Sequence, residues 1–175
     1  RGGNYARNVG IKNSAGTYIA FLDDDDEWLP EKIEKQMQCI HKKDGYGLVY
    51  TGFIASYDNP IFNYRKLPNK LIEGDLLEKK LYISPYFNTS VMLVKKEIVD
   101  LVGGFDENVR YWQEYELMLR LIQHTKVTFV NEPLVRIDRS YNQRGRLTNK
   151  VDGWKEAVNY INEKHKEIFK LLDDE

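Results

Sequence analysis

The stretch TYIAFLDDDDEWLPEK, Thr17 to Lys32, predicts the fold more strongly than any other part of the chain. Its first six positions, TYIAFL, are a run rich in β-branched and aromatic residues with few polar interruptions, which is typical of a strand buried on both faces. Asp23 to Asp26 follow as an acidic run, and Pro30 opens a helix at a first-turn position, where its missing N–H leaves nothing unsatisfied. We therefore expect a strand, an acidic loop and a helix in that order.

Outward from this stretch, apolar periodicity and turn residues divide the rest of the chain. Strands alternate with helices in the first half, which predicts an α/β/α three-layer sandwich with a mostly parallel central sheet that can include an antiparallel strand. The other expected elements are a helix over 5–15 ending at a left-handed Gly16, a strand over 47–56, an irregular loop over 57–70, short helices over 73–80 and 95–102, strands over 89–94, 127–130 and 134–137, and amphipathic helices over 113–124 and 152–172.

The four consecutive aspartates repel one another, and burying any of them without a partner is costly. A cation is the simplest compensation, and Mg²⁺ or Mn²⁺ takes carboxylate oxygens together with substrate phosphates. Asp23 and Asp25 have the spacing of a DxD motif. The alternative interpretation is a solvated loop that caps the following helix.

Composition limits the class of protein. The 175 residues, 42% of them hydrophobic, are enough for one core, and a net charge of -1 gives no support for a nucleic-acid partner.

The single cysteine, Cys39, excludes an internal disulfide, fits a reducing compartment and is expected to be a small buried hydrophobe. No apolar run reaches the roughly 20 residues that span a bilayer, so we expect a cytoplasmic protein, with association at the inner face of the membrane left open. The start at Arg1, without methionine, suggests an excised piece.

The passage ARNVGIKNSAGTYI followed by FLDDDDEWLPEK closely resembles the inverting family 2 glycosyltransferases of the GT-A fold. This resemblance implies that Asp23, Asp25 and Asp26 contact the diphosphate of a nucleotide sugar through a divalent metal, Mg or Mn, with Asp25 as the leading ligand and Asp23 as the second. It also implies that Arg7 and Asn8 shape the nucleotide side of the pocket. The residues that match the family pattern are Gly3, Ala6, Arg7, Asn8, Gly10, Gly16, Asp23, Asp25, Asp26, Trp28 and Pro30.

A second block, from Asn88 to Arg120, is similar to the same family through its GGFDE turn at 103–107. The family carries an acidic pair at the start of the next helix, whose second member is the general base. Gln113 and Glu114 stand there, so the resemblance implies Glu114 as the base, one methylene longer than the usual Asp. Glu116 is the backup, and the alternative for Glu114 is an acid that complements the helix dipole.

The remaining polar and aromatic residues are expected to have mainly structural roles. We expect Asp106 to bond its own turn, and Phe105 and Trp112 to pack, although Trp112 could stack on a pyranose face. A phosphate role for Arg139 rests on the family alone. The three histidines, His41, His124 and His165, lack ligand-like spacing and are expected at the surface, which gives no zinc site.

The resemblance implies one partial catalytic domain: a donor and metal half over 1–45, an acceptor half over 46–140 and a helical extension over 141–175. The family's base- and ribose-binding part would lie upstream, so this fragment alone should be weakly active or inactive. The implied activity is transfer of a sugar from a nucleoside diphosphate to a glycan, lipid-linked or protein hydroxyl, in surface polysaccharide or glycoconjugate synthesis. Donor sugar, linkage and oligomeric state are not predicted.

Two other functions compete with transfer. A non-catalytic nucleotide-sugar or carbohydrate-binding module on the same scaffold would account for the departure at Gln113 and Glu114. A phosphotransferase with an aspartyl nucleophile would also favour a DxD after a strand, but it needs Thr or Gly soon after the second Asp, where this chain has Asp26, Glu27 and Trp28.

Overall fold

The structure is a computed structural model that describes residues 2–42, 44–68, 72–77, 88–140 and 151–173. The described strands form one mixed sheet of order β1-β5-β3-β6-β2, with β4 added to β3. The strands are β1 (Tyr18–Ala20), β2 (Asp26–Trp28), β3 (Tyr46–Ser56), β4 (Tyr64–Lys66), β5 (Met92–Lys95) and β6 (Lys126–Asp138). The helices are α1 (Gly3–Asn13), α2 (Lys32–His41), α3 (Lys96–Leu101), α4 (Gln113–Leu121), α5 (Val151–Lys164) and α6 (Lys166–Asp173).

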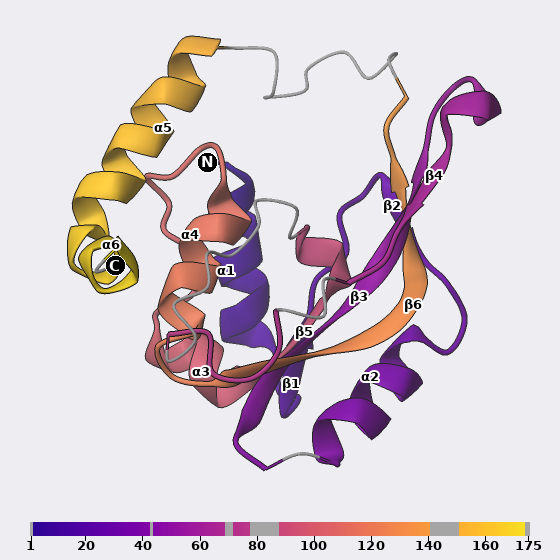
Figure 1. Cartoon of the computed structure of the whole chain (residues 1–175), viewed down its shortest axis with the longest axis horizontal. Coiled ribbons are helices and arrows are strands. Elements are labelled where there is room, and N and C mark those ends of the chain that lie inside the picture. Colours follow the sequence, from indigo (N-terminus) through magenta and orange to yellow (C-terminus); the bar gives the residue numbers. More distant parts are fainter. Residues whose placement is uncertain (1, 43, 69–71, 78–87, 141–150, 174–175) are drawn as a thin grey trace.

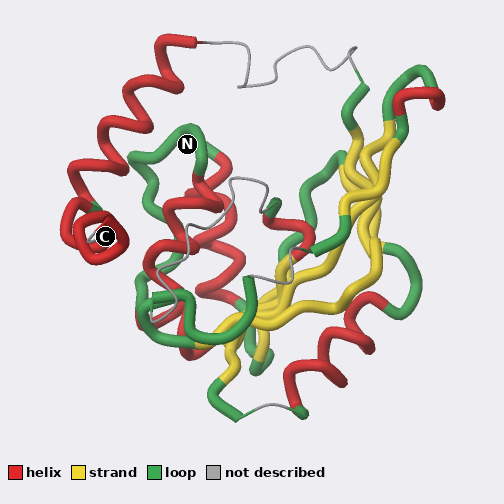
Figure 2. Tube along the Cα trace, viewed as in Figure 1, coloured by secondary structure: helices red, strands yellow, loops and turns green. Residues whose placement is uncertain are grey.

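Helices cover both faces of the sheet, as a three-layer sandwich requires (Figures 1 and 2). Leu48 and Tyr50 of β3 point into the larger core, which also holds apolar side chains of α1, α3 and α4. Val49, between them, points to the opposite face and joins the core under α2 with Ile40. The alternation along β3 is that of a strand buried on both sides.

The expectation of a mostly parallel sheet is wrong for the described residues. Only β3 and β6 run parallel, whereas β5 runs antiparallel to β3, and β1 to β5. The helix α2 leads from β2 to β3, but β2 pairs with β6 and not with β3, so this connection forms no parallel unit. Alternation of helices and strands predicted the layers but not which strands are neighbours.

The strand expected over 17–22 is shorter and lies at an edge of the described sheet, because β5 is the only described strand that pairs with β1. Leu22 is half exposed at 50%. At the other edge, residues 26–28 of the acidic stretch form β2 against β6, a strand that the sequence did not predict. The run of aspartates has low intrinsic β-propensity, and pairing with β6 overrides it.

Several other elements differ from expectation. The helix over 5–15 ends at Asn13, and Gly16 is not left-handed. Part of the loop over 57–70 is the strand β4, and the two strands over 127–137 are one strand, β6, with bulges against β3. Residues 73–77 form no helix, since Gly74 bridges Val127 instead; 78–80 lie outside the described residues.

The terminal helix expected over 152–172 is two helices, α5 and α6, which meet at His165. They pack beside α4 through Leu119, Ile161 and Ile168. Residues 141–150, the beginning of the expected extension, lie outside the described residues. No helix in the described ranges is long and apolar enough to cross a membrane.

Candidate active site

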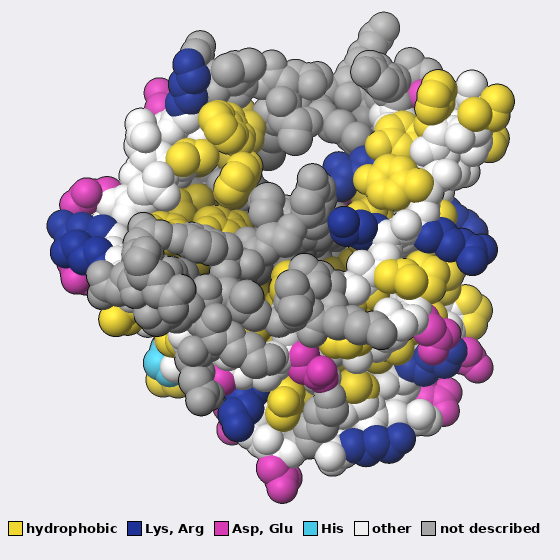
Figure 3. Space-filling model, viewed as in Figure 1, with side chains coloured by type: hydrophobic (Ala, Val, Ile, Leu, Met, Phe, Trp, Pro, Cys, Tyr) yellow, Lys and Arg dark blue, Asp and Glu magenta, His cyan; other side chains and the backbone are white. Residues whose placement is uncertain are grey.

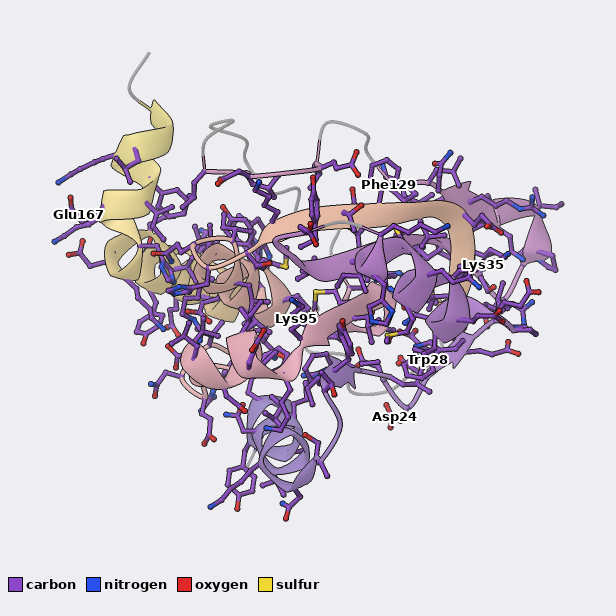
Figure 4. All side chains as sticks on the ribbon, turned by 90° about the horizontal axis from the view of Figure 1, so that it is seen from below. Asp24, Trp28, Lys35, Lys95, Phe129 and Glu167 are labelled. Atoms are coloured by element: carbon purple, nitrogen blue, oxygen red, sulfur yellow. The ribbon has the colours of Figure 1, made fainter. Side chains whose placement is uncertain are left out.

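The acidic run connects the two edges of the sheet, because it follows β1 at one edge and enters β2 at the other. A short 3-10 helix, η2 (Thr89–Val91), packs against this run and is hydrogen-bonded to it. The Asp23 N–H donates to Ser90 Oγ at 3.1 Å, and the Trp28 indole N–H donates to the Ser90 carbonyl at 3.0 Å. Asp24, between these anchors, is exposed and points away from the sheet (Figure 4).

The Asp23 carboxylate is held by two donors from outside the acidic run. Arg7 Nη2 lies 2.6 Å from Asp23 Oδ1, and the Thr89 hydroxyl donates to Asp23 Oδ2 at 3.1 Å. Each oxygen therefore has a protein partner. This arrangement orients the Asp23 carboxylate and compensates part of the charge of the run.

Arg7 connects the two blocks that the sequence analysis singled out. Its other nitrogen, Nη1, donates to Gln113 Oε1 at 2.9 Å, and its guanidinium lies over the Phe105 ring at 5.4 Å from the centroid. The guanidinium thus reaches Asp23 in the acidic run and Gln113 at the start of α4. A planar fork of donors can make both bonds at once, which a lysine ammonium cannot do with the same geometry.

Asp26, the last aspartate of the acidic run, is partly buried. Desolvation, followed by the charges of Asp23 and Asp25, raises its pKa to about 6, although hydrogen bonds from the Ser90 side chain and the Asp138 backbone oppose the shift. Its Oδ2 is buried and has no hydrogen-bond partner among the described residues. A carboxylate with an unsatisfied buried oxygen, close enough to two other acids for their charges to raise its pKa, is where an added cation would be most stabilising.

Glu114 lies in the first turn of α4, half-buried and close to the same charges. Desolvation raises its pKa, and the charge of Asp23 adds to the shift while those of Arg7 and Arg139 oppose it. The residue before the helix, Trp112, has a left-handed backbone with φ of 59°, which is uncommon outside glycine and often occurs at functional sites. The candidate base and the acidic run therefore share one electrostatic environment.

Asn8 fixes the GGFDE turn. Its amide exchanges two hydrogen bonds of 2.8 Å with the backbone of Phe105, and its Nδ2 also reaches Glu107. Gly104 has φ of +70°, and a Cβ there would lie 2.6 Å from Asn8 Oδ1, so the turn accepts only glycine at this position. Contact of Asn8 with a nucleotide stays a prediction, and its observed contacts are structural.

Glu116, the backup base, has a structural role instead. It is fully buried and bonded to Arg120 at 2.6 Å, Lys164 at 2.8 Å and His165 at 3.0 Å. Desolvation would raise its pKa, but the hydrogen bonds from His165, Arg120 and Lys164 outweigh it and lower the pKa to about 2. The surface position expected for His165 is therefore wrong, because its ring closes this buried network.

The aromatic and turn residues of the second block behave largely as expected. Phe105 is buried against Phe21, and Trp112 makes edge contacts with Tyr115 and with Trp154 of α5. Asp106 accepts from the Asn108 N–H at 2.9 Å, which is the predicted turn bond. A bond from Lys164 to Asp106 adds a second attachment of α5.

Sequence reasoning missed the polar residues beneath the acidic run. Thr89 and Ser90 are fully buried; Thr89 is hydrogen-bonded to Asp23, and Ser90 to both Asp23 and Asp26. Only one feature of the sequence indicates this role, namely two hydroxyl residues near the start of the NTSVMLV segment. Lys32, 1% exposed, lies over the Trp28 ring and donates to Gln36, which in turn donates to two backbone carbonyls. Desolvation lowers the pKa of Lys32 to about 7.

The described residues contain no group of three His, Cys, Asp or Glu side chains able to hold a metal. A cation at the acidic run would therefore need further ligands from a bound molecule, such as a diphosphate. The unsatisfied Asp26 oxygen, with Asp25 beside it, fits such a shared site.

Comparison with solved structures defines the class of fold. TarS of S. aureus, residues 1–349 in complex with UDP, matches with a TM-score of 0.66 and 12% identity over 98% of this chain and 49% of its own. A mannosyltransferase of Pyrobaculum calidifontis in complex with GDP-Man and Mn²⁺ matches with a TM-score of 0.57 and 16% identity over 98% of this chain and 49% of its own. The likeness to these structures confirms the expected GT-A fold.

The chain belongs to glycosyl transferase family 2, whose sequence model matches residues 1–103. An uncharacterized glycosyltransferase of Haemophilus influenzae is 29% identical over 165 residues, which cover 93% of this chain and 55% of the relative. The amylovoran biosynthesis glycosyltransferase AmsB of Erwinia amylovora is 28% identical over 119 residues, or 66% of this chain and 39% of the relative. The chain thus spans about half the length of the relatives it matches.

Proposed function

We propose that the protein transfers a sugar from a nucleoside diphosphate to a hydroxyl acceptor with inversion, using Glu114 as general base. The observation that carries the proposal is Arg7, whose guanidinium bonds Asp23 of the acidic run and Gln113, the neighbour of Glu114. A donor diphosphate at the acidic run would therefore lie next to a carboxylate of raised pKa. UDP in TarS and GDP-Man in the mannosyltransferase support this class of donor.

In this proposal, each residue has one task. The acceptor O–H attacks the anomeric carbon while Glu114 takes its proton, and the bond from that carbon to the diphosphate oxygen breaks in the same step. Desolvation makes Glu114 a stronger base than a solvated glutamate, because it raises the pKa. Arg7 orients Asp23 and Gln113, and Asn8 keeps the GGFDE turn against α1.

A divalent cation, Mg²⁺ or Mn²⁺, would offset charge on the leaving diphosphate when bound. Asp25 is our leading ligand. Asp23 is the second candidate, although Arg7 and Thr89 already hold its oxygens, and the unsatisfied Asp26 Oδ2 is the other oxygen available. The Mn²⁺ in the Pyrobaculum structure supports the choice of metal.

The acceptor belongs to polysaccharide or other glycoconjugate synthesis in this proposal. The name of AmsB refers to amylovoran biosynthesis, and a Bacillus subtilis relative, 30% identical over 82 residues, is named for teichuronic acid biosynthesis. A free glycan, a lipid-linked glycan and a protein remain alternative acceptors.

A transfer assay on the full-length protein tests the proposal. Labelled UDP-glucose, UDP-galactose, UDP-N-acetylglucosamine and GDP-mannose are offered with and without Mn²⁺, and the anomeric configuration of the product is read by NMR. We expect turnover with one donor, inversion, and a loss of at least about 100-fold for Asp25→Asn. Retention of configuration, or full activity of Asp25→Asn in the presence of a chelator, would contradict it.

The second candidate, a non-catalytic sugar-nucleotide module, is favoured by the Gln113–Glu114 pair in place of the family's Glu-Asp. Donor binding without turnover by the wild type, in the same assay, would support it.

A further inference from the structure

The hairpin of β3 and β4 contains a cavity outside the candidate active site. Its volume is about 480 Å³, and it is lined by Tyr57, Asp58, Asn59, Phe62 and Tyr64. This volume is within the range of pockets that bind small molecules. None of these residues has a role in the proposed transfer step.

The wall of the cavity has the chemistry of a sugar-binding surface. Phe62 is 63% exposed and Tyr64 45%, and the Tyr57 and Tyr64 rings lie 6.3 Å apart at 36°. Figure 3 shows hydrophobic side chains gathered over this end of the molecule, at the upper right. A sugar ring has apolar C–H faces that stack on aromatic rings and a rim of hydroxyls for hydrogen bonds. Asp58 and Asn59 supply polar groups beside the rings.

The strand register relates the cavity to the acidic run. Tyr64 is paired with Ala55, Ala55 with Ile137, and Ile137 with Asp26. Directly paired residues project to the same face of a sheet, so Tyr64 and Asp26 share a face. Three strand spacings of about 4.8 Å put their backbones about 14 Å apart.

We propose that the hairpin cavity binds a sugar ring of a glycan acceptor, at a distance from the ring that receives the transferred sugar. The proposal rests on the proposed glycosyl transfer. A glycan that enters the site along this face of the sheet would place one ring at Glu114 and the acidic run and a more distant ring on Phe62 and Tyr64. In this proposal, the aromatic side chains are exposed in the ligand-free protein and are covered when the glycan binds.

Saturation-transfer NMR titration of the full-length protein tests this inference, with maltotriose, cellotriose and chitotriose as probes. We expect at least one trisaccharide to bind the wild type, and Phe62→Ala and Tyr64→Ala each to weaken that binding about fivefold to tenfold. The matched control is Ile61→Ala, since Ile61 is 84% exposed beside Phe62 and does not line the cavity. Thermal unfolding of each variant checks that the hairpin is intact.

Donor binding separates this inference from the proposed function. Titration with UDP and GDP should give the same affinity in Phe62→Ala as in the wild type, because Phe62 is remote from the acidic run. Trisaccharide binding without any transfer activity would remove the proposed function and leave the sugar site. Transfer activity with no trisaccharide bound, or with equal binding by Phe62→Ala, would overturn the sugar site.

The exposed tip also suggests a lipid contact, which the same variants distinguish. Vesicles of phosphatidylethanolamine and phosphatidylglycerol are sedimented with the wild type and with Ile61→Ala. If the vesicles bind, Ile61→Ala releases the protein and no trisaccharide binds, the hairpin is a membrane contact and the proposal is wrong.

Discussion

The Arg7 guanidinium lies 2.6 Å from the Asp23 carboxylate, and both side chains are about four-fifths buried, at 21% and 23% exposed. The pair joins helix α1 to the acidic run, which is also held by η2 through Thr89 and Ser90 and, at Asp26, by pairing with β6. Because the same guanidinium also bonds Gln113, a change at Arg7 releases both the acidic run and the start of α4. The two family motifs are therefore one unit in space.

We expect Arg7→Lys to lower transfer by about 100-fold, because an ammonium cannot hold both partners in the geometry of the planar fork. Arg7→Ala should lose as much. Steady-state kinetics of both variants measure the loss, and Lys12→Ala, at an exposed position of the same helix, is the control. Wild-type rates for Arg7→Lys would show that the bridge is not required.

Replacing Glu114 by Gln removes the proposed base and keeps the size of the side chain. We expect the turnover rate to fall by about 100-fold to 10,000-fold while donor affinity stays unchanged. Glu156→Gln, at an exposed position of α5, is the matched control. Unchanged turnover would exclude Glu114 as base, and lost donor affinity would indicate a binding role.

The sequence predicted best what depends on local pattern. The strand at Tyr18–Ala20, the helices at 32–41 and 113–121 and the turn at 103–107 all have a periodicity or a glycine signal of their own. The order of motifs along the chain also led to the GT-A fold. These features are local or belong to a family pattern.

What the sequence did not predict depends on partners distant in the chain. The strands β2 and β4 exist because β6 and β3 pair with them, and neither segment has a strand pattern. Likewise, nothing in the sequence distinguishes Glu114, the half-buried candidate base at the start of α4, from the fully buried Glu116 two residues later. Burial of Lys32 follows from Trp28 and Gln36 together, which only the fold brings around it.

Lys32 predicts a dependence of stability on alkaline pH. Its pKa is lowered to about 7 in the fold from 10.5, so between these values the unfolded chain binds a proton that the folded protein does not. The free energy of unfolding should therefore rise with pH from about 7 to about 10, by at most about 5 kcal/mol. Lys32→Met should lack this rise.

Urea unfolding at pH 7, 8.5 and 10 measures the effect for wild type and Lys32→Met. Lys12→Met controls for the loss of a lysine at an exposed position. A constant difference between wild type and Lys32→Met across this range would mean that Lys32 keeps its charge in the folded protein.

Glu116 predicts a dependence of stability on acidic pH, because its pKa is lowered to about 2 from 4.5. The folded protein holds this carboxylate ionised where the unfolded chain would protonate it. The stability that Glu116 contributes is complete above pH 4.5 and is lost as pH falls towards 2. Glu116→Gln should thus be less stable than wild type by about 3 kcal/mol at pH 7, and this difference in the free energy of unfolding should close in acid.

Unfolding at pH 7, 5 and 3, with Glu167→Gln as the exposed control, measures the gap, and Trp154 fluorescence reports whether α5 leaves α4 in the same transition. A gap that persists at pH 3 would show that the packing of Glu116, and not its charge, holds the two helices together.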